Sequence, residues 1–149
     1  MKSAEGIYSF IDQQKYNLYI VELTHKSWEA ILPDGTRAAI DKNDFSFEEN
    51  GKRIKPDFAY ITIHGTPGEN GILQGYFELI GMPYSTCDVL VSALTFSKFL
   101  LNQYLKGFGI RVAESLLVKK KNGITDEQVM ETIGLPCFIK PNASGSSFG

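Results

Sequence analysis

The sequence predicts an α/β fold, and two observations lead to that prediction. Segments whose apolar residues recur at helical spacing alternate along the chain with short runs rich in β-branched and aromatic residues. Residues 58–63 (FAYITI) form a mostly apolar run of strand length between Pro56–Asp57 and a glycine-rich stretch, which is typical of a buried parallel strand. We therefore expect a parallel sheet that is flanked by helices.

The part of the chain before residue 58 is expected to hold one helix and three strands. Residues 33–36 (PDGT) are typical of a turn between two short strands, and the mostly polar residues 41–55 predict a loop. The elements expected here are a helix over 3–14 and strands over 16–23, 27–32 and 37–40.

The part of the chain after the glycine-rich stretch is expected to hold three helices and two strands. Gly81 and Pro83 are typical of the end of the first helix. Residues 125–128 (TDEQ) form a capping box, in which the threonine hydroxyl accepts from a backbone amide while the glutamine side chain reaches back. The expected elements are helices over 72–80, 89–105 and 125–134 and strands over 112–118 and 135–140.

The composition is that of a soluble globular protein. With 149 residues, 43% of them hydrophobic and 21% charged, the chain can form one core, or one domain and part of a second. A net charge of −2 without a basic face excludes nucleic acid as the main partner. We expect no membrane association, because no apolar run is long enough to span a bilayer and no signal-peptide pattern occurs. Two cysteines without C-x-x-C spacing fit reduced thiols in a cytoplasmic protein.

The sequence GSSFG at 145–149 allows two interpretations. It fits the G-x-S-x-G turn that presents a hydrolase serine, and it also fits a glycine- and serine-rich hairpin whose amides fold over phosphates. A hydrolase of that type has its acid and histidine later in the chain, whereas both histidines, His25 and His64, come earlier. We therefore favour the phosphate-binding loop.

His64 is a candidate site residue because it ends the predicted strand 58–63, where open α/β sheets bind their ligands. The glycines after it let the backbone approach a ligand closely, and the following helix offers its first amides to an anion. Neither G-x-G-x-x-G nor the P-loop pattern occurs. On spacing alone, His64 is equally well a strand-end histidine that a loop amide caps.

Three blocks of sequence in order resemble the D-alanine–D-alanine ligases of the ATP-grasp superfamily. They are HGTPGENGILQGYFELIGMPYS (64–85), SALTFSKFLLNQYLKGFGI (92–110) and GLPCFIKPNASGSSFG (134–149). The resemblance implies a Rossmann-like N-terminal domain with a parallel sheet (pre-ATP-grasp) over 1–94, whose first strand is missing. It implies that residues 95–149 begin the ATP-grasp central α+β domain.

The resemblance implies an ATP-dependent enzyme that joins two D-alanines to D-alanyl-D-alanine for peptidoglycan precursor synthesis, and thus for cell-wall biogenesis and cell shape. It also implies a cytoplasmic homodimer that uses Mg²⁺, with the metal-binding carboxylates beyond residue 149 and none in this chain. The alternatives are another ATP-grasp ligase, of the D-alanine–D-lactate or D-serine type, or a non-catalytic dimerisation or binding domain. Residues 1–149 alone are expected to be inactive and to bind ATP no tighter than millimolar.

The resemblance also implies roles for individual residues. Lys98 and Lys140 match the family lysines that contact the ATP phosphates and the nucleotide, although a single lysine is more often a surface residue. Ser146 matches the serine that helps to hold D-alanine, and Ser147 belongs to the loop whose amides fold over the phosphates. His64 lies in the loop that lines the first D-alanine subsite.

Two residues depart from the family pattern. Asn70 stands where the family usually has Asp, and it is expected to keep a helix-capping role, since Asn and Asp cap about equally well. Ser97 stands where the family has the Asp of an Asp-Lys pair, so a carboxylate beside Lys98 is lost.

Overall fold

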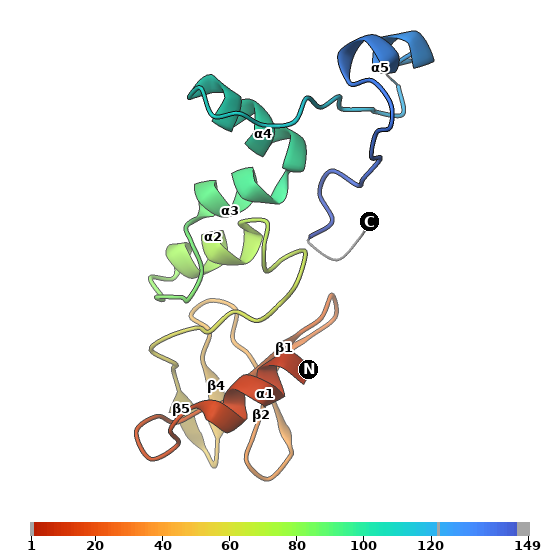
Figure 1. Ribbon diagram of the computed structural model, residues 1–149. Coiled ribbons are helices and arrows are strands. Elements are labelled where there is room, and N and C mark those ends of the chain that lie inside the picture. Colours follow the sequence, from red (N-terminus) through yellow and green to blue (C-terminus); the bar gives the residue numbers. More distant parts are fainter. Residues whose placement is uncertain (1, 122, 146–149) are drawn as a thin grey trace. The chain divides into compact units, whose positions relative to one another are not determined.

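The computed structural model describes residues 2–121 and 123–145, and their elements confirm the α/β class (Figure 1). The residues cluster into two compact units. The first lies within Met1–Thr62 and Tyr76–Ser85, and the second within Ile63–Gly75 and Thr86–Gly149. Helix α2 (Ile72–Leu79) contributes its first residues to the second unit and its last residues to the first unit.

The first unit opens with helix α1 and a three-stranded antiparallel sheet (Figure 1). The helix is α1 (Lys2–Phe10), and the strands are β1 (Ile20–Leu23), β2 (Trp28–Ile31) and β3 (Arg37–Ala39), in the order β1-β2-β3. Ala30 lies at the centre of the sheet and is completely buried. The predicted helix and three strands are confirmed. The helix begins and ends earlier than predicted, and each strand is shorter than predicted at one end or at both.

The predicted loop over residues 41–55 is wrong, because a second hairpin lies within it. Strands β4 (Phe47–Glu49) and β5 (Lys52–Ile54) pair antiparallel on either side of Asn50 and Gly51. Both turn residues have positive φ, 50° and 71°. Asn-Gly is the dipeptide that two-residue hairpin turns favour, since both positions tolerate this backbone conformation. The polar composition of the segment obscured that signal.

A cluster of aromatic rings forms the core of the first unit. The rings of Phe45 and Phe77 meet edge to face with centroids 5.1 Å apart, and Trp28 and Tyr76 do so at 5.0 Å. Phe45 has φ of 64°, a left-handed conformation that costs about 1–2 kcal/mol for a residue other than glycine. Burial of a Phe side chain contributes about 1.5–3 kcal/mol, so the cluster offsets this strain.

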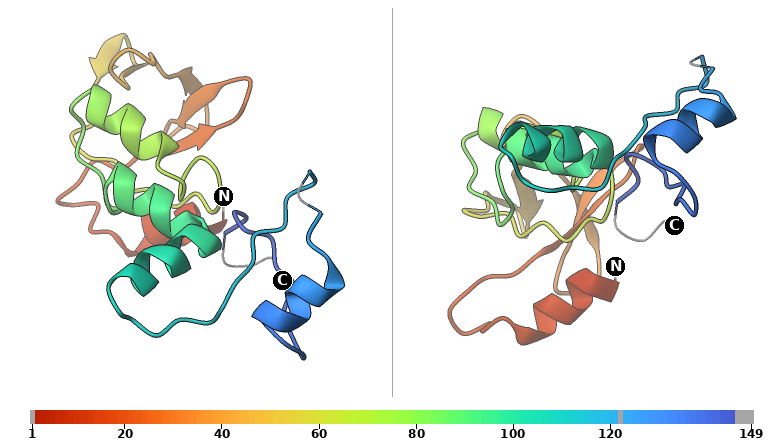
Figure 2. Two further views of the ribbon diagram at one scale, coloured as in Figure 1. Left: turned by 90° about the horizontal axis from the view of Figure 1, so that it is seen from above. Right: turned by 45° about the horizontal axis from the view of Figure 1, so that its top comes forward.

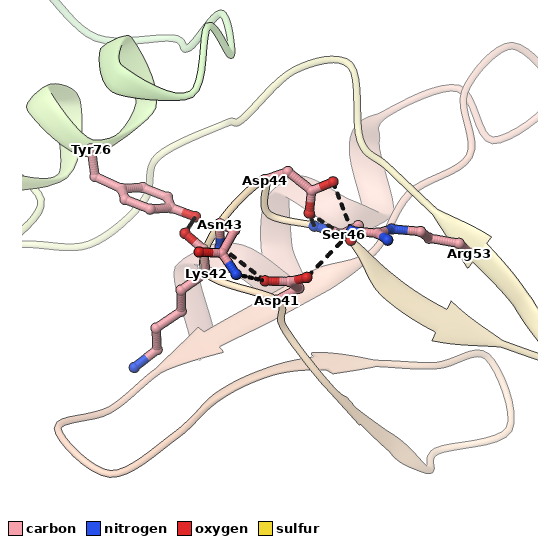
Figure 3. A network of polar contacts seen from close by, with 7 residues as sticks. All are labelled: Asp41, Lys42, Asn43, Asp44, Ser46, Arg53 and Tyr76. Atoms are coloured by element: carbon pink, nitrogen blue, oxygen red, sulfur yellow. Dashed lines mark hydrogen bonds and ion pairs between the residues drawn. The ribbon is translucent and has the colours of Figure 1, made fainter.

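A network of polar contacts joins the loop before β4 to strand β5 (Figure 3). Arg53 donates from Nε to Ser46 Oγ at 2.9 Å and pairs through Nη2 with Asp44 at 2.9 Å and Asp41 at 3.3 Å. The Tyr76 hydroxyl donates to the carbonyl oxygen of Lys42 at 3.0 Å, which ties helix α2 to the same loop. The network therefore connects elements that the aromatic cluster packs together.

The predicted strand over residues 58–63 is extended backbone with a single parallel bridge, between Ala59 and Tyr84. Ala59 donates to the Pro83 carbonyl at 2.9 Å and accepts from the Ser85 amide at 3.1 Å. The Ile61 amide, two residues after Ala59, donates to the Ser85 hydroxyl and not to a backbone carbonyl. The backbone pairing between the two segments therefore ends at this point. Within the described residues, both sheets are antiparallel, so the expected parallel sheet is limited to this bridge.

The second unit contains the helices α3 (Val89–Phe96), α4 (Lys98–Gly107) and α5 (Asp126–Thr132). The single helix predicted over 89–105 is wrong, because Ser97 has φ of −91° and ψ of 103° and separates α3 from α4. The predicted capping box is confirmed: Thr125 Oγ1 accepts from the Gln128 amide and Gln128 Oε1 accepts from the Thr125 amide.

Residues 112–118 and 135–140 do not form the predicted strands. Both segments are irregular backbone, and Figure 2 shows no strand arrow in residues 112–118. Val118, Phe138 and Ile139 are 67%, 90% and 94% exposed. An apolar run becomes a strand only when another strand supplies the hydrogen bonds and a second layer covers its face. No such strand pairs with these segments within the described residues.

We expect the Asp44 carboxylate to stabilise the protein at neutral pH and not in acid. Hydrogen bonds from the Ser46 hydroxyl and amide, with Arg53 nearby, hold the pKa of Asp44 below its ordinary value. A lowered pKa stabilises the fold above the unfolded pKa of about 3.9, and the contribution is lost as pH falls through the lower folded pKa. Thermal unfolding of the Asp44→Ala variant should therefore show a reduced Tm at pH 7 and a smaller difference from wild type near pH 3.

Asp57→Ala is the matched control, because Asp57 is exposed and has no hydrogen bond or ion pair to another described residue. Its Tm should follow that of the wild type at both pH values. An equal loss of Tm at pH 7 and pH 3 in Asp44→Ala would contradict the role of the carboxylate charge.

Candidate functional site

The loop from His64 to Gly71 folds back on the residue that precedes it. A Cβ atom at Gly68 would overlap the carbonyl oxygen of Ile63, so no larger residue fits there without a shift of backbone. The Glu69 amide donates to the Gly65 carbonyl at 2.7 Å, which closes a tight turn inside the loop. Asn70 Oδ1 accepts from the amide of Ile72, the first residue of α2, at 3.3 Å, which agrees with the expected role of Asn70 at the start of this helix.

Glu69 is the charged residue at the centre of this loop. Its Oε2 accepts from the Gly65 amide at 2.7 Å, and its Oε1 lies 3.7 Å from Nδ1 of His64. The His64 side chain is 81% exposed, whereas that of Glu69 is 36% exposed. The predicted role of His64 stays a prediction, and the described contacts of His64 are those of an exposed side chain beside a carboxylate.

Gln74, on helix α2, anchors the loop at Gly68. Its Nε2 donates to the Gly68 carbonyl at 2.7 Å and to Thr86 Oγ1 at 2.9 Å. The residue is completely buried, and its Oε1 has no partner among the described residues. Loss of these bonds would leave buried polar groups without partners, which costs about 1–3 kcal/mol for each group, so the loop is held firmly at this point.

Lys98 begins helix α4 and is half-buried. Its Nζ donates to the carbonyl oxygen of Gly145 at 3.1 Å. No carboxylate of the described residues forms an ion pair with it. An ammonium group has three donor hydrogens, so Lys98 retains capacity for an anion. Ser97, immediately before it, caps α4 by accepting from the Leu100 amide at 3.3 Å.

Glu69, Gln74 and Lys98 all line one cavity of about 410 Å³ within the second unit. Glu69 and Lys98 supply its charges, and Phe96 supplies an apolar wall. The volume lies in the range of small-molecule sites, about 300–1,000 Å³. The lining residues come from the glycine-rich loop, from helices α2, α3 and α4, and from the segments before α3 and before residue 146. They are Gly68, Glu69, Gln74, Thr86, Cys87, Ser92, Thr95, Phe96, Lys98 and Gly145.

Gly145 lines the cavity in a left-handed backbone conformation that favours glycine. Its φ is 76°, and a Cβ atom there would lie 3.0 Å from Glu69 Oε2 and 3.8 Å from the Gly65 backbone. The segment before residue 146 therefore packs closely against the turn of the loop. The sequence pattern placed Gly145 in the phosphate-binding hairpin, and its contact with the loop adds a second constraint on that residue.

The remaining predicted site residues are not gathered at this cavity. Lys140 is exposed, and its Nζ lies 5.4 Å from the ring centroid of Phe138. The expectation that Lys140 ends a strand is wrong, since residues 135–140 are irregular. Ser146 and Ser147 lie outside the described residues. The site roles of all three residues stay predictions.

Three residues of the site were not identified from the sequence. Glu69 and Gln74 belong to the sequence block at 64–85, but their spacing did not indicate that both would line a cavity. Asn142 hydrogen-bonds the first turn of α4. Its contact spans residues far apart in the sequence, so only the fold could show it.

The described residues do not by themselves offer a site for a divalent metal. No group of three or more His, Cys, Asp or Glu side chains lies together in residues 2–121 and 123–145. Mg²⁺ is bound through carboxylates and phosphates, and the cavity holds the single carboxylate of Glu69. Nothing in the described part of the chain is a helix long and apolar enough to cross a membrane.

Comparison with known sequences identifies a family. The profile described as "D-ala D-ala ligase N-terminus" matches residues 1–87. The chain is 70% identical over 149 residues to the D-alanine–D-alanine ligase of Phocaeicola vulgatus and covers 46% of it. It is 46% identical over 148 residues to that of Porphyromonas gingivalis W83 and covers 45% of it. The chain thus spans about half the length of these relatives.

Comparison with solved structures supports the fold. The D-alanine–D-alanine ligase of Coxiella burnetii has a TM-score of 0.82 at 24% identity, over 98% of this chain and 47% of that one. The VanG D-Ala:D-Ser ligase of Enterococcus faecalis has a TM-score of 0.72 at 27% identity, over 97% of this chain and 48% of that one. The resemblance that was based on the three sequence blocks is confirmed by these matches and by the profile.

We expect Gly68→Ala to destabilise the site loop. The added Cβ would overlap the Ile63 carbonyl, and overpacking of this kind costs about 1–3 kcal/mol. Urea unfolding of the variant should show a lower midpoint. Gly107→Ala is the matched control, because its Cβ would have nothing within 4 Å at the end of α4, and the change should be neutral or stabilising by up to about 1 kcal/mol. Equal midpoints for the two variants would contradict the close contact at Gly68.

Proposed function

The chain belongs to the D-alanine–D-alanine ligase family, and on that premise we propose that the whole protein joins two D-alanines to D-alanyl-D-alanine with cleavage of ATP to ADP and phosphate. The observation that carries this proposal is the cavity in which the Lys98 ammonium has no carboxylate partner among the described residues. A cation held in a small-molecule cavity suits a substrate with phosphate or carboxylate groups.

The proposed reaction has two steps, and charge stabilisation is the task of this part of the chain. The carboxylate of one D-alanine takes the γ-phosphoryl group of ATP and becomes an acyl phosphate, and ADP leaves. The amine of the second D-alanine then attacks the acyl carbon, and phosphate leaves. Lys98 would offset negative charge on the phosphoryl group and then on the phosphate. A divalent ion bound elsewhere in the whole protein would supply further shielding of the phosphates.

The roles of the other predicted residues belong to the same proposal. Lys140 would contact the nucleotide, Ser147 would lie in the loop that folds over the phosphates, and Ser146 would help to hold D-alanine. His64 would line the first D-alanine subsite, where its contact with Glu69 would orient it. The match of residues 1–87 to the family's N-terminal profile supports the role of His64. The identity of 70% over 149 residues to the D-alanine–D-alanine ligase of Phocaeicola vulgatus supports the roles of the other three residues.

Further proposals concern the whole protein. We propose an N-terminal domain over residues 1–94 and a central ATP-grasp domain that begins at residue 95. The product would serve peptidoglycan precursor synthesis in the cytoplasm, and thus cell-wall biogenesis and cell shape, and the enzyme would be a homodimer. The identity of 70% to a D-alanine–D-alanine ligase supports the enzyme class.

A second candidate function is ligation of D-alanine to D-serine. The observation that favours this candidate is the structural likeness to the VanG D-Ala:D-Ser ligase, at 27% identity. It is the weaker candidate, because the D-alanine–D-alanine ligase of Phocaeicola vulgatus is 70% identical.

The choice of second substrate can be measured directly. The whole protein, incubated with D-alanine, ATP and Mg²⁺, should form D-alanyl-D-alanine and release one phosphate per dipeptide. Addition of D-serine or D-lactate in equal amount should leave D-alanyl-D-alanine as the main product. A dominant product with D-serine would favour the second candidate, and a dominant product with D-lactate would contradict both candidates. Absence of any ATP-dependent product would reject the ligase proposal.

We expect Lys140→Ala and Lys98→Ala to impair the use of ATP. A charge-assisted contact to a phosphate is worth about 1.5–3 kcal/mol, so each variant should raise the KM for ATP and lower kcat/KM by up to about a hundredfold. Lys55→Ala is the matched control, because Lys55 is exposed and has no ion pair to a described residue. Normal turnover by either site variant would remove that lysine from the proposed ATP site.

A further inference from the structure

Asn142 joins the segment after Lys140 to the first turn of helix α4. Its backbone carbonyl accepts from the Lys98 amide at 3.1 Å, and its side-chain Oδ1 accepts from the Phe99 amide at 2.9 Å. Its Nδ2 donates to Ser97 Oγ at 3.0 Å. Ser97 Oγ also donates to Asn142 Oδ1 at 3.3 Å. A single residue thus makes four hydrogen bonds to three consecutive residues that lie far from it in the sequence.

These bonds complete the N-terminal cap of α4. A helix leaves its first amides without intrahelical partners, and they must find acceptors elsewhere. The Leu100 amide is accepted by Ser97 Oγ, and those of Lys98 and Phe99 are accepted by Asn142. All three amides are therefore occupied, so the helix end has no free donor for a phosphate. What this end of the helix presents to the cavity is the ammonium of Lys98.

The position of that ammonium depends on the same segment. Lys98 is held at its backbone by Asn142 and at its Nζ by the carbonyl of Gly145. Both anchors lie within four residues of chain, so the lysine side chain runs from the helix to the segment that closes the cavity. A lysine has several rotatable bonds, and fixing its two ends selects a few of its conformers.

We propose that Asn142 is a positioning residue for Lys98, and that Asn142 and Ser97 together perform the capping that one aspartate could perform alone. A serine hydroxyl accepts here from a single amide, so a second acceptor must come from outside the helix. A carboxylate has two oxygens and can accept from both the second and third amides of a helix. The proposal rests on the proposed function at one point, which is that Lys98 binds ATP.

The test uses the whole protein and two variants, Asn142→Ala and the double variant Asn142→Ala with Ser97→Asp. Asn142→Ala removes the side-chain bonds to the Phe99 amide and to Ser97 and keeps the backbone bond to Lys98. It should raise the KM for ATP and the Kd for ATP measured by calorimetry about tenfold, the equivalent of one net hydrogen bond. The KM for D-alanine should stay within about twofold of wild type, since the residue acts through Lys98. In the double variant, the carboxylate introduced by Ser97→Asp should restore both Tm and ATP affinity.

Asn102→Ala is the matched control, because Asn102 lies on the same helix and has no hydrogen bond from its side chain to a described residue. It should resemble wild type in every measurement. An unchanged ATP affinity in Asn142→Ala, with only Tm reduced, would overturn the proposal by showing a purely structural role. If Asn142→Ala does not fold, the double variant decides: wild-type ATP affinity supports positioning by the cap, and weak affinity overturns it. Absence of ligase activity in the wild type, with the Kd effects as predicted, would reject the proposed function and leave the positioning role standing.

Discussion

The candidate site exists because the first turn of α4 takes hydrogen-bond acceptors from Asn142, far along the chain. Without those acceptors, two amides at the start of the helix would lack partners, and an unpaired amide away from water costs about 1–3 kcal/mol. The same bonds bring the segment that ends at Gly145 to the side of Lys98. The cavity, its cation and its close contact with the glycine-rich loop all follow from that arrangement.

The cavity combines a small number of polar groups with specific supports. Glu69 is oriented by the Gly65 amide, and Lys98 is oriented by the Gly145 carbonyl. Gln74 uses both hydrogens of its amide group to hold the loop at Gly68 and to bond Thr86. A hydrogen bond to the backbone thus orients the side chain of each charged residue, and each side chain retains capacity for a ligand. A binding site for a charged small molecule requires both properties.

The first unit is held by a different kind of interaction. Aromatic rings from β2, from the loop before β4 and from α2 meet edge to face, and the burial of Phe45 offsets its left-handed backbone. The polar network around Arg53 fixes the loop that supplies Phe45. Nonpolar burial supplies most of the stability of such a unit, and the polar contacts select one conformation of the loop.

Local features of the sequence determined the helices and turns that depend on a few neighbouring residues. The capping box at Thr125, the turn at residues 33–36 and the helix after Asn70 formed as predicted, because each is closed by contacts within a few positions. The family, too, was evident from motifs in the sequence alone. The Asn50–Gly51 hairpin was also a local signal, but the polar residues around it led to the prediction of a loop.

Tertiary structure decided everything that needs a partner from elsewhere in the chain. Residues 58–63 have the composition of a central strand, yet a strand requires neighbours, and the described residues supply one bridge. Residues 112–118 and 135–140 remained irregular for the same reason. Ser97 divided a continuous apolar pattern into two helices, because Asn142 supplied the acceptors that a new helix end needs. Apolar periodicity cannot reveal such a break, since the acceptor that permits it is distant in sequence and becomes a neighbour only when the chain folds.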